Sequence, residues 1–281
     1  MISVTSLSSY SYCPRKLFLS NVLKIVEIPK AVLIKGKIKH EIFEAVNNSE
    51  EAIVRSITDK QTAGSLENRF GQEYAKILRK TIIMNRAGLK AADLKIMDVY
   101  KEITPLISLE SAAKASSIYA FIAENNLFGD ELWQNLVPKI KSEQRAESST
   151  LGIRGIIDQI HVYPDHIVPF ELKTGSMPAD GVWPGHKLQL GAYILLLNEK
   201  AGEIKKGYVR YVDHGTDRPV VMNPFFREQI TDTIEKTTCV LKSVEVPDYC
   251  SNKNKCASCP LKKQCYDEAF IRAKIRMLID G

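Results

Sequence analysis

Two short apolar segments, residues 152–163 and 166–173, flank a connection of only two residues, Pro164 and Asp165. Proline presets φ at a turn and aspartate tolerates the second corner, so this pair suits a tight connection between strands. Apolar runs of this length on both sides of such a turn predict a β-hairpin. The hairpin constrains the fold strongly, because its turn also fixes which residues face each other.

The register of this hairpin brings two acidic residues together. If residues 164–165 form the loop, Tyr163 faces His166, and counting back along both strands places Asp158 opposite Glu171. Directly opposed residues have Cβ atoms roughly 4.5–5.5 Å apart. Two carboxylates that close repel each other unless one is protonated or a cation lies between them.

A lysine joins this pair, because the period of two along a strand puts Lys173 on the same face as Glu171, with Leu172 on the other. A hard metal ion beside an ammonium group suits phosphodiester hydrolysis: the metal polarises phosphate and activates water, and the lysine stabilises developing negative charge. The simpler interpretation is a solvent-exposed salt bridge. Against it, the flanking residues are strongly apolar, namely Ile153, Ile156, Ile157, Ile160, Ile167, Val168 and Phe170.

The composition is that of a globular protein, with 281 residues, 44% hydrophobic and 26% charged. This length is enough for one large domain or two small ones. No run approaches the ~20 apolar residues of a membrane span, and the N-terminus lacks the pattern of a signal peptide. We therefore expect a cytoplasmic protein with no membrane partner. A net charge of +6 is compatible with a polyanionic partner without requiring one.

The cysteines predict a metal centre, since a cytoplasmic chain of this size is not expected to be a disulfide scaffold. Cys256, Cys259 and Cys265 combine a C-x₂-C pair with a third cysteine six residues on, which can wrap one centre. The fourth ligand is open between Cys250, which would give a compact site typical of structural zinc, and Cys13, which would join the two ends of the chain. Proline after Cys13 and after Cys259 favours iron–sulfur, but the spacing alone does not separate zinc from iron.

Periodicity predicts the remaining elements. Helices are expected over residues 3–24, 30–47, 65–88, 108–126, 128–136, 185–199, 224–244 and 266–279, strands over 137–147, 152–163, 166–173, 207–212 and 218–222, and a cysteine loop over 246–265. Pro138 places the first of these strands at a sheet edge. Cys239, within a periodic helix, is expected to be a buried small hydrophobe.

Several motifs occur along the chain in the order of one family. They are Cys13-Pro-Arg-Lys16, Gly36 with His40, Gly155-Ile-Ile-Asp158, Glu171-Leu-Lys173, Gln189-Leu-Gly-Ala-Tyr193 and the triplet Cys256, Cys259 and Cys265. In this order the sequence resembles the CRISPR-associated RecB-like exonucleases with an iron–sulfur cluster, the Cas-four family within the PD-(D/E)XK nuclease superfamily. The resemblance covers about residues 1–47 and 140–270, whereas the middle region has no counterpart.

The resemblance implies an α/β fold, with a mixed central sheet flanked by helices as in a PD-(D/E)XK restriction-endonuclease-like core. It also implies a helical insertion and N- and C-terminal regions stapled by an iron–sulfur cluster. Four parts are expected: an N-terminal helical part with Cys13 and His40 over 1–49, the insertion over 50–136, the nuclease core over 137–245, and the cysteine cluster with the last helix over 246–281.

The resemblance also implies roles for individual residues. A [4Fe–4S] cluster would be bound by Cys13, Cys256, Cys259 and Cys265. Mn²⁺ or Mg²⁺ would be bound by His40, Asp158, Glu171 and the Leu172 carbonyl, because oxygen-rich coordination suits these ions. Lys173 would position water or stabilise charge, and Gln189 and Tyr193 would contact DNA or brace the site.

The implied activity is a metal-dependent DNA exonuclease or end-trimming nuclease of CRISPR adaptation, acting on single-stranded ends or overhangs of spacer precursors. The expected partners are DNA, a CRISPR integrase complex and further copies of the chain. One alternative is a non-catalytic iron–sulfur or zinc DNA-binding subunit, and another is a ferredoxin-like redox protein. The intact set of Asp158, Glu171 and Lys173 argues against both alternatives.

Overall fold

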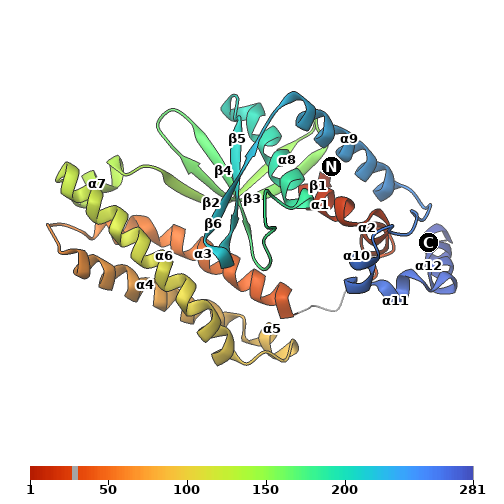
Figure 1. Cartoon of the computed structure of the whole chain (residues 1–281), viewed down its shortest axis with the longest axis horizontal. Helices are drawn as coiled ribbons and strands as arrows, with labels where there is room; N and C mark the ends of the chain where they lie inside the picture. Colours follow the sequence, from red (N-terminus) through yellow and green to blue (C-terminus); the bar gives the residue numbers. More distant parts are fainter. Residues whose placement is uncertain (27–30, 281) are drawn as a thin grey trace.

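The computed structural model describes residues 1–26 and 31–280. Its centre is a six-stranded mixed sheet (Figure 1). The strands follow the order β1 (Ile2–Ser3), β3 (Ile153–Val162), β4 (Ile167–Lys173), β5 (Lys206–Tyr211) and β6 (Thr216–Val221), and β2 (Lys139–Ser148) pairs with the other edge of β3. The predicted class, a mixed α/β fold with helices around the sheet, is confirmed.

The predicted hairpin is β3 and β4. Its antiparallel register runs from Val162 opposite Ile167 to Gln159 opposite Phe170. Tyr163 N–H donates to the carbonyl of His166 at 2.9 Å, which closes the two-residue turn. The predicted register is confirmed, and Asp158 and Glu171 are the next two residues beyond the paired ladder.

The sheet opens beside Asp158. On one edge, β3 pairs with β1 at Ile153 and Arg154 and with β4 only from Gln159 onward. In the described part of the chain, residues 155–158 therefore have no strand partner on that edge. We call this gap between β1 and β4 the fork. Both β1 and the fork were missed from the sequence, because two strand residues give no periodic signal.

The expected helix over 3–24 is two helices, α1 (Val4–Tyr12) and α2 (Pro14–Asn21). Cys13 between them has an extended backbone, with φ −168°, and the following proline has no N–H to continue the first helix. Cys13 instead starts α2, since its sulfur accepts a hydrogen bond from the backbone N–H of Lys16 at 3.4 Å. The break places the thiol of Cys13 at a helix junction.

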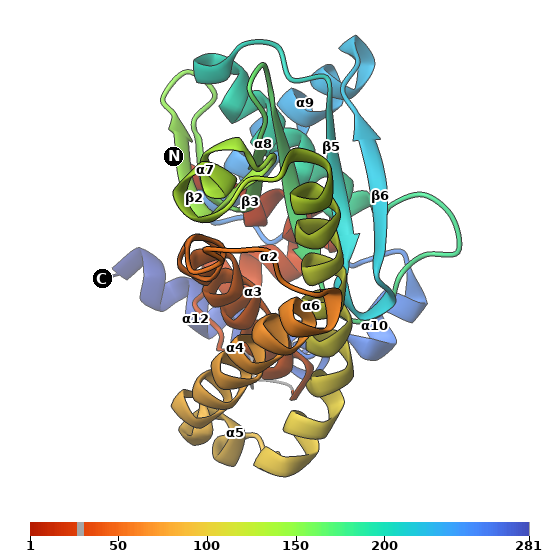
Figure 2. The same cartoon turned by 90° about the vertical axis from the view of Figure 1, so that its left-hand side faces the viewer.

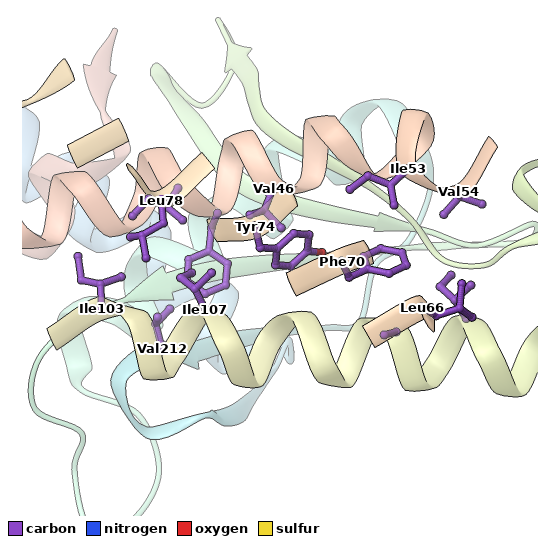
Figure 3. Packing of buried hydrophobic residues seen from close by; sticks show 14 of the residues in the cluster. Val46, Ile53, Val54, Leu66, Phe70, Tyr74, Leu78, Ile103, Ile107 and Val212 are labelled. Atoms are coloured by element: carbon purple, nitrogen blue, oxygen red, sulfur yellow. The ribbon is translucent and has the colours of Figure 1, made fainter. Parts of the chain in front are cut away.

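A layer of helices covers one face of the sheet. It comprises α3 (Ala31–Arg55), α4 (Ala63–Met84), α5 (Arg86–Ala91), α6 (Ile96–Asn125) and α7 (Gly129–Asn135). Its core packs α3, α4 and α6 together, with Val46, Phe70, Tyr74 and Ile107 meeting in Figure 3. Leu172 of β4 and Val212 belong to the same core, so this layer is continuous with the sheet.

Three predicted boundaries in this layer were wrong, and the first is the end of the helix expected over 30–47, which continues to Arg55. The helix α6 begins at Ile96 rather than at residue 108 and contains Pro105. Proline is unfavourable inside a helix, but Val99, Ile103 and Ile107 bury at helical spacing on both sides of it and outweigh the cost. The expected 65–88 helix is split into α4 and α5 at Asn85. Lys30, the expected first residue of the second helix, lies outside the described residues.

Two helices lie on the sheet away from α4 and α5, as both views show (Figures 1 and 2). They are α8 (Pro184–Ala201) and α9 (Pro224–Lys242). Every residue of α8 from Leu188 to Leu197 is buried. The prediction for Cys239 of α9 was wrong: its side chain is exposed, because the buried face of this helix runs through Phe226, Ile230 and Ile234. Among the described helices, none combines the length and apolar character needed to cross a membrane.

The two ends of the chain meet through a small separate core of Phe18, Leu19, Leu23, Ile25, Leu261 and Ile271. The expected cysteine loop contains two short helices, α10 (Lys253–Ser258) and α11 (Lys262–Cys265), and α12 (Glu268–Asp280) follows. Figure 1 shows these elements beside α2 at the end of the molecule opposite α7.

Candidate active site and cysteine pocket

Three elements bring potential metal ligands together at the fork. His40 of α3, Glu143 of β2 and Asp158 of β3 each offer one ligand atom within 4.8 Å of the other two. His40 Nδ1 lies 3.6 Å from Asp158 Oδ1. All three side chains are partly buried. One imidazole and two carboxylates form a donor set that a hard divalent cation can use.

Sequence reasoning missed Glu143. It lies directly opposite Asp158, between the pairs Ser142–Gln159 and Gln144–Ile157. Its φ is +51°, a left-handed conformation that is uncommon for a residue other than glycine and that clusters at functional sites. Burial, together with the charge of Asp158, raises the pKa of Glu143. The connection between β2 and β3 spans residues 149–152, and a loop of that length does not fix one register as the two-residue turn does.

Asp158 is oriented by the backbone of the neighbouring strand. The Leu172 N–H donates to Asp158 Oδ2 at 2.7 Å, which leaves Oδ1 toward His40. Burial alone would lower the pKa of His40, but the hydrogen bond and charge of Asp158 outweigh it, so this pKa is raised. The prediction that Leu172 points away from the catalytic face holds, since its side chain is in the core beneath α3 and α6.

Glu171 is the most buried carboxylate of the site, with 2% of its surface exposed. Its Oε1 atom lies 2.8 Å from Lys173 Nζ and accepts a hydrogen bond from Gln189 Nε2 at 2.6 Å. Its Oε2 atom is buried with no hydrogen-bond partner. Burial and the charge of Asp158 raise the pKa of Glu171 to about 8, although Lys173 opposes the shift. A cation at Oε2 would satisfy this orphan oxygen, so the residues present fit a metal ion.

Two residues of α8 complete the arrangement. Gln189 accepts a hydrogen bond from Lys173 Nζ at 2.9 Å while donating to Glu171, so it bridges the two charged groups. Tyr193 OH lies 3.4 Å from Gln189 Nε2. Gly155 permits this packing, because a Cβ there would lie 2.6 Å from the Tyr193 ring. The structure thus gathers Glu171, Lys173, Gln189 and Tyr193, while Glu171 stands outside the tight group around His40.

The turn after Lys173 is fastened to α3. The Gly175 N–H donates to Asp213 Oδ2 at 2.7 Å, and Asp213 Oδ1 pairs with the buried Lys39 Nζ at 2.5 Å. The helix also approaches closely, since a Cβ on Gly36 would lie 3.0 Å from Thr174 Oγ1. These contacts therefore fix the position of α3, which carries His40, relative to the end of β4, which carries Lys173.

Five cysteines gather at the junction of the two chain ends. Cys13, Cys250, Cys256, Cys259 and Cys265 line one pocket. Its other lining residues are Tyr12, Lys16, Leu19, Lys255, Leu261, Lys262 and Tyr266. All six cysteines are free thiols, and Cys239 is the one outside this pocket. The structure brings together all four residues expected as cluster ligands and adds Cys250.

Residues other than cysteine hold this pocket together. Arg15 is 4% exposed, and its guanidinium donates to the carbonyls of Pro247 and Cys265 at 2.9 and 3.2 Å. It also pairs with Glu268 at 3.1 Å. Tyr12 OH donates to the carbonyl of Lys255 at 3.0 Å. These bonds join segments more than 230 residues apart in sequence, so the pocket does not depend on its thiols alone.

The sulfur positions bear on which metal centre fits. In a tetrahedral zinc site each Zn–S bond is about 2.3 Å, which puts the sulfurs roughly 3.8 Å apart. Among the described residues, no three cysteine sulfurs lie within 4.8 Å of one another. Cys250 interacts with both Cys13 and Cys256, so it lies between the N-terminal thiol and the C-terminal triplet.

Comparisons with known proteins agree with this geometry. A model of the PD-(D/E)XK nuclease superfamily matches residues 1–266. The chain is 30% identical over 133 residues to a CRISPR-associated exonuclease Cas4/endonuclease Cas1 fusion of Myxococcus xanthus, covering 45% of this chain and 23% of that protein. It is 26% identical over 247 residues to the DNA replication ATP-dependent helicase/nuclease DNA2 of Gallus gallus, covering 82% of this chain and 23% of that protein.

A third relative is one component of the ATP-dependent helicase/deoxyribonuclease of Carboxydothermus hydrogenoformans. The identity is 25% over 221 residues, which cover 70% of this chain and 18% of that protein. The chain therefore spans about a quarter or less of the length of these three relatives.

Proposed function

This chain belongs to the PD-(D/E)XK nuclease superfamily, and from this premise we propose that it is a metal-dependent DNA exonuclease that trims single-stranded ends or overhangs. The resemblance expected from the sequence motifs is confirmed by the family match and by the Cas4-containing relative. The observation that carries the proposal is Glu171, a buried carboxylate with one unpartnered oxygen and an ammonium group at the other.

The proposed metal is Mn²⁺ or Mg²⁺. His40, Glu143 and Asp158 would hold it, with Glu171 Oε2 and the Leu172 carbonyl as the further ligands expected from the sequence. Such an ion supplies Lewis-acid polarisation of the phosphate and lowers the pKa of a bound water. The imidazole in the set favours Mn²⁺ somewhat.

The protein groups around that position stabilise charge. Lys173 is held by Glu171 and Gln189, so its ammonium is oriented before substrate arrives and can stabilise the negative charge that develops on phosphate. Burial raises the pKa of Tyr193 far above its ordinary range, so its hydroxyl stays neutral. Tyr193 and Gln189 therefore serve to position Glu171 and Lys173 rather than to transfer protons.

We propose a [4Fe–4S] cluster bound by Cys13, Cys256, Cys259 and Cys265 as a second centre with a structural role. The shared pocket supports it, as does the proline that follows both Cys13 and Cys259. When bound, it would add a covalent link between the chain ends that Arg15 already joins. Burial raises the pKa of the Cys13 thiol, so ligation at this residue would release a proton.

A place in CRISPR adaptation, trimming spacer precursors beside an integrase, rests on one relative. The Myxococcus xanthus protein is a fusion of a Cas4 exonuclease with a Cas1 endonuclease, and 45% of this chain aligns with it. We propose that an integrase of that kind is the partner here, with further copies of the chain as additional contacts.

The test is degradation of single-stranded DNA labelled at the 5′ or the 3′ end, in Mn²⁺, Mg²⁺ or EDTA. Wild type is compared with Glu171→Ala and Lys173→Ala, and with Glu203→Ala and Lys205→Ala as matched controls. Glu203 and Lys205 form an exposed ion pair at 3.5 Å, just before β5. Cutting in Mn²⁺ or Mg²⁺ that both site variants lose and both controls keep would support the nuclease.

Two other results would overturn it. If wild type and site variants are equally inactive while DNA binding persists, the chain is the non-catalytic DNA-binding protein instead. If the site variants cut as well as wild type, a contaminant is responsible and the site is wrong. The label that is released first gives the polarity of cleavage.

A further inference from the structure

A groove of about 660 Å³ opens at the fork on the side away from the hairpin turn. We call it the fork groove. Its lining is formed by Ser3, Val4, Thr5, Arg145, Ala146, Glu147, Arg154, Gly155, Ile156, Tyr193 and Lys200. The proposed mechanism uses only Tyr193 of these residues, so the groove has no role in the account of catalysis given above.

The β3 register connects the fork groove to the candidate active site. Ile156 and Arg154 lie two and four residues before Asp158 on β3, which at roughly 3.3 Å per residue is about 7 and 13 Å along the strand. Cross-strand partners share a face, so Arg145 opposite Ile156 and Glu147 opposite Arg154 extend this row onto β2. A linear polymer whose reacting group lies at Asp158 can therefore continue past Arg145 and Arg154.

The charge of the fork groove favours an anion. Arg145, Arg154 and Lys200 are its cations, and within the described part of the chain none of them has an ion-pair partner. Glu147 is its one acidic lining residue. Elsewhere cations on this fold are often neutralised, as Lys39 is by Asp213 and Arg210 is by Asp217. Three unpaired cations in one groove beside a phosphodiesterase site suit a chain of phosphates.

One residue that lines the fork groove, Tyr193, also contacts the residues of the candidate active site. The ring of Tyr193 packs against Gly155, and its hydroxyl lies 3.4 Å from Gln189, which bonds Glu171 and Lys173. The side chain of Ile156 is 44% exposed in the groove and offers an apolar surface between the basic groups. Arginine and lysine side chains bind phosphate oxygens, and contacts of this kind position a strand without reading its sequence.

We propose that the fork groove binds backbone phosphates of the DNA strand next to the scissile phosphate, through Arg145 and Arg154 with Lys200 at the rim. This proposal rests on the proposed function, because it takes the reacting phosphate to lie at Asp158 and Glu171. The contacts are electrostatic and independent of base sequence. They determine how the strand enters the site rather than how the bond is broken.

The first experiment measures binding without turnover. Labelled single-stranded DNA is titrated in EDTA at several salt concentrations, comparing wild type with Arg145→Ala/Arg154→Ala. The control, Arg79→Ala/Lys80→Ala, removes two exposed cations from α4. Each phosphate contact on a single strand contributes about 0.7 to the slope of log affinity against log salt, so the groove variant should lose about 1.4 of that slope. The control should keep the wild-type slope.

A second experiment locates the contacts along the strand and separates them from misfolding. Single methylphosphonate linkages, which carry no charge, are placed one at a time through the DNA. In wild type, neutralising a linkage near the scissile position should weaken binding, and the groove variant should no longer respond at that linkage. Arg145→Lys/Arg154→Lys, which keeps both charges, should restore most of the response.

Equal salt slopes for wild type and groove variant would overturn the proposal, as would a methylphosphonate profile that the variant leaves unchanged. Both readouts are independent of cleavage. A protein inactive in the nuclease assay whose groove variant loses the salt slope refutes the proposed activity and supports the groove. An active nuclease with an unchanged slope refutes the groove alone.

Discussion

The candidate active site and the cysteine pocket are built in opposite ways. The active site draws His40, Glu143, Asp158 and Glu171 from a helix and three adjacent strands, inside two large hydrophobic cores. The cysteine pocket joins the first two helices to the last three through a small core and a set of polar bonds around Arg15. The active site is therefore positioned by the central sheet and its helices. The cysteine pocket lies where the N-terminal and C-terminal segments of the chain contact each other.

This difference indicates what each centre depends on. Asp158 and Glu171 are held by hydrogen bonds from the Leu172 N–H and from Gln189, so we expect them to keep their positions without a metal. The thiols lie on short helices and a helix junction, so their geometry is more easily altered. We expect a substitution that abolishes metal binding at one centre to leave metal binding at the other unchanged.

The largest expected effect is at Glu171. Glu171→Gln removes the charge but keeps the shape and the Gln189 contact, so the rate of DNA cleavage should fall by roughly 10³-fold. Thermal stability should be kept or improved, because a neutral amide replaces a carboxylate that burial penalises. Iron content should stay at the wild-type level. A variant that cleaves within tenfold of wild type would contradict the assignment.

The next effect tests the residue that the sequence motifs did not reveal. Glu143→Gln should weaken Mn²⁺ binding by about 10-fold to 100-fold, measured by titration calorimetry, since it removes the charge of one of the four proposed side-chain ligands. Glu147→Gln, four residues along the same strand and outside the group, is the matched control. Equal Mn²⁺ affinity in the two variants would remove Glu143 from the site.

A smaller effect is a pH dependence of the metal-free protein. Unfolded, Glu171 loses its proton near its ordinary pKa of 4.5, whereas folded it keeps the proton up to about 8. Between these values the folded state binds more protons, so the free energy of unfolding should fall as pH rises, by at most about 1.4 kcal/mol per pH unit. The raised pKa of His40 acts in the same direction.

Urea unfolding in EDTA across that window measures the slope. Glu171→Gln should flatten it, and saturating Mn²⁺ should flatten it in wild type, because the cation replaces the proton at the carboxylate. A slope that is the same in wild type and Glu171→Gln would show that another group is responsible.

The smallest expected effect on the active site comes from the cysteine pocket. Cys256→Ser should remove visible absorption and iron, yet change Mn²⁺ affinity by no more than about 0.4 kcal/mol, because sites that share no contact act independently. Cys239→Ser, an exposed thiol outside the pocket, is the control that should change neither quantity. Loss of Mn²⁺ binding in Cys256→Ser would show that the two centres are coupled.

Much of the hairpin was predictable because its turn has two residues, which left one register for Asp158 and Glu171. Glu143 was not found because its position depends on a longer connection, over residues 149–152, and on a left-handed backbone angle that no local pattern indicates. The start of α6 was predicted too late because Pro105 disfavours a helix locally, whereas burial against α4 stabilises the helix through it. The positions of site residues could be predicted where a short turn fixes the strand register. They could not be predicted where tertiary packing decides the structure.

Two separate metal centres can be tested by measuring both metals in the same samples of wild type, Glu171→Gln and Cys256→Ser. Bound Mn²⁺ is measured by electron paramagnetic resonance after titration, and iron by elemental analysis. We expect Glu171→Gln to lose tight Mn²⁺ binding and keep iron, and Cys256→Ser to keep Mn²⁺ and lose iron. Loss of both metals in either variant, or wild-type Mn²⁺ binding in Glu171→Gln, would contradict this expectation.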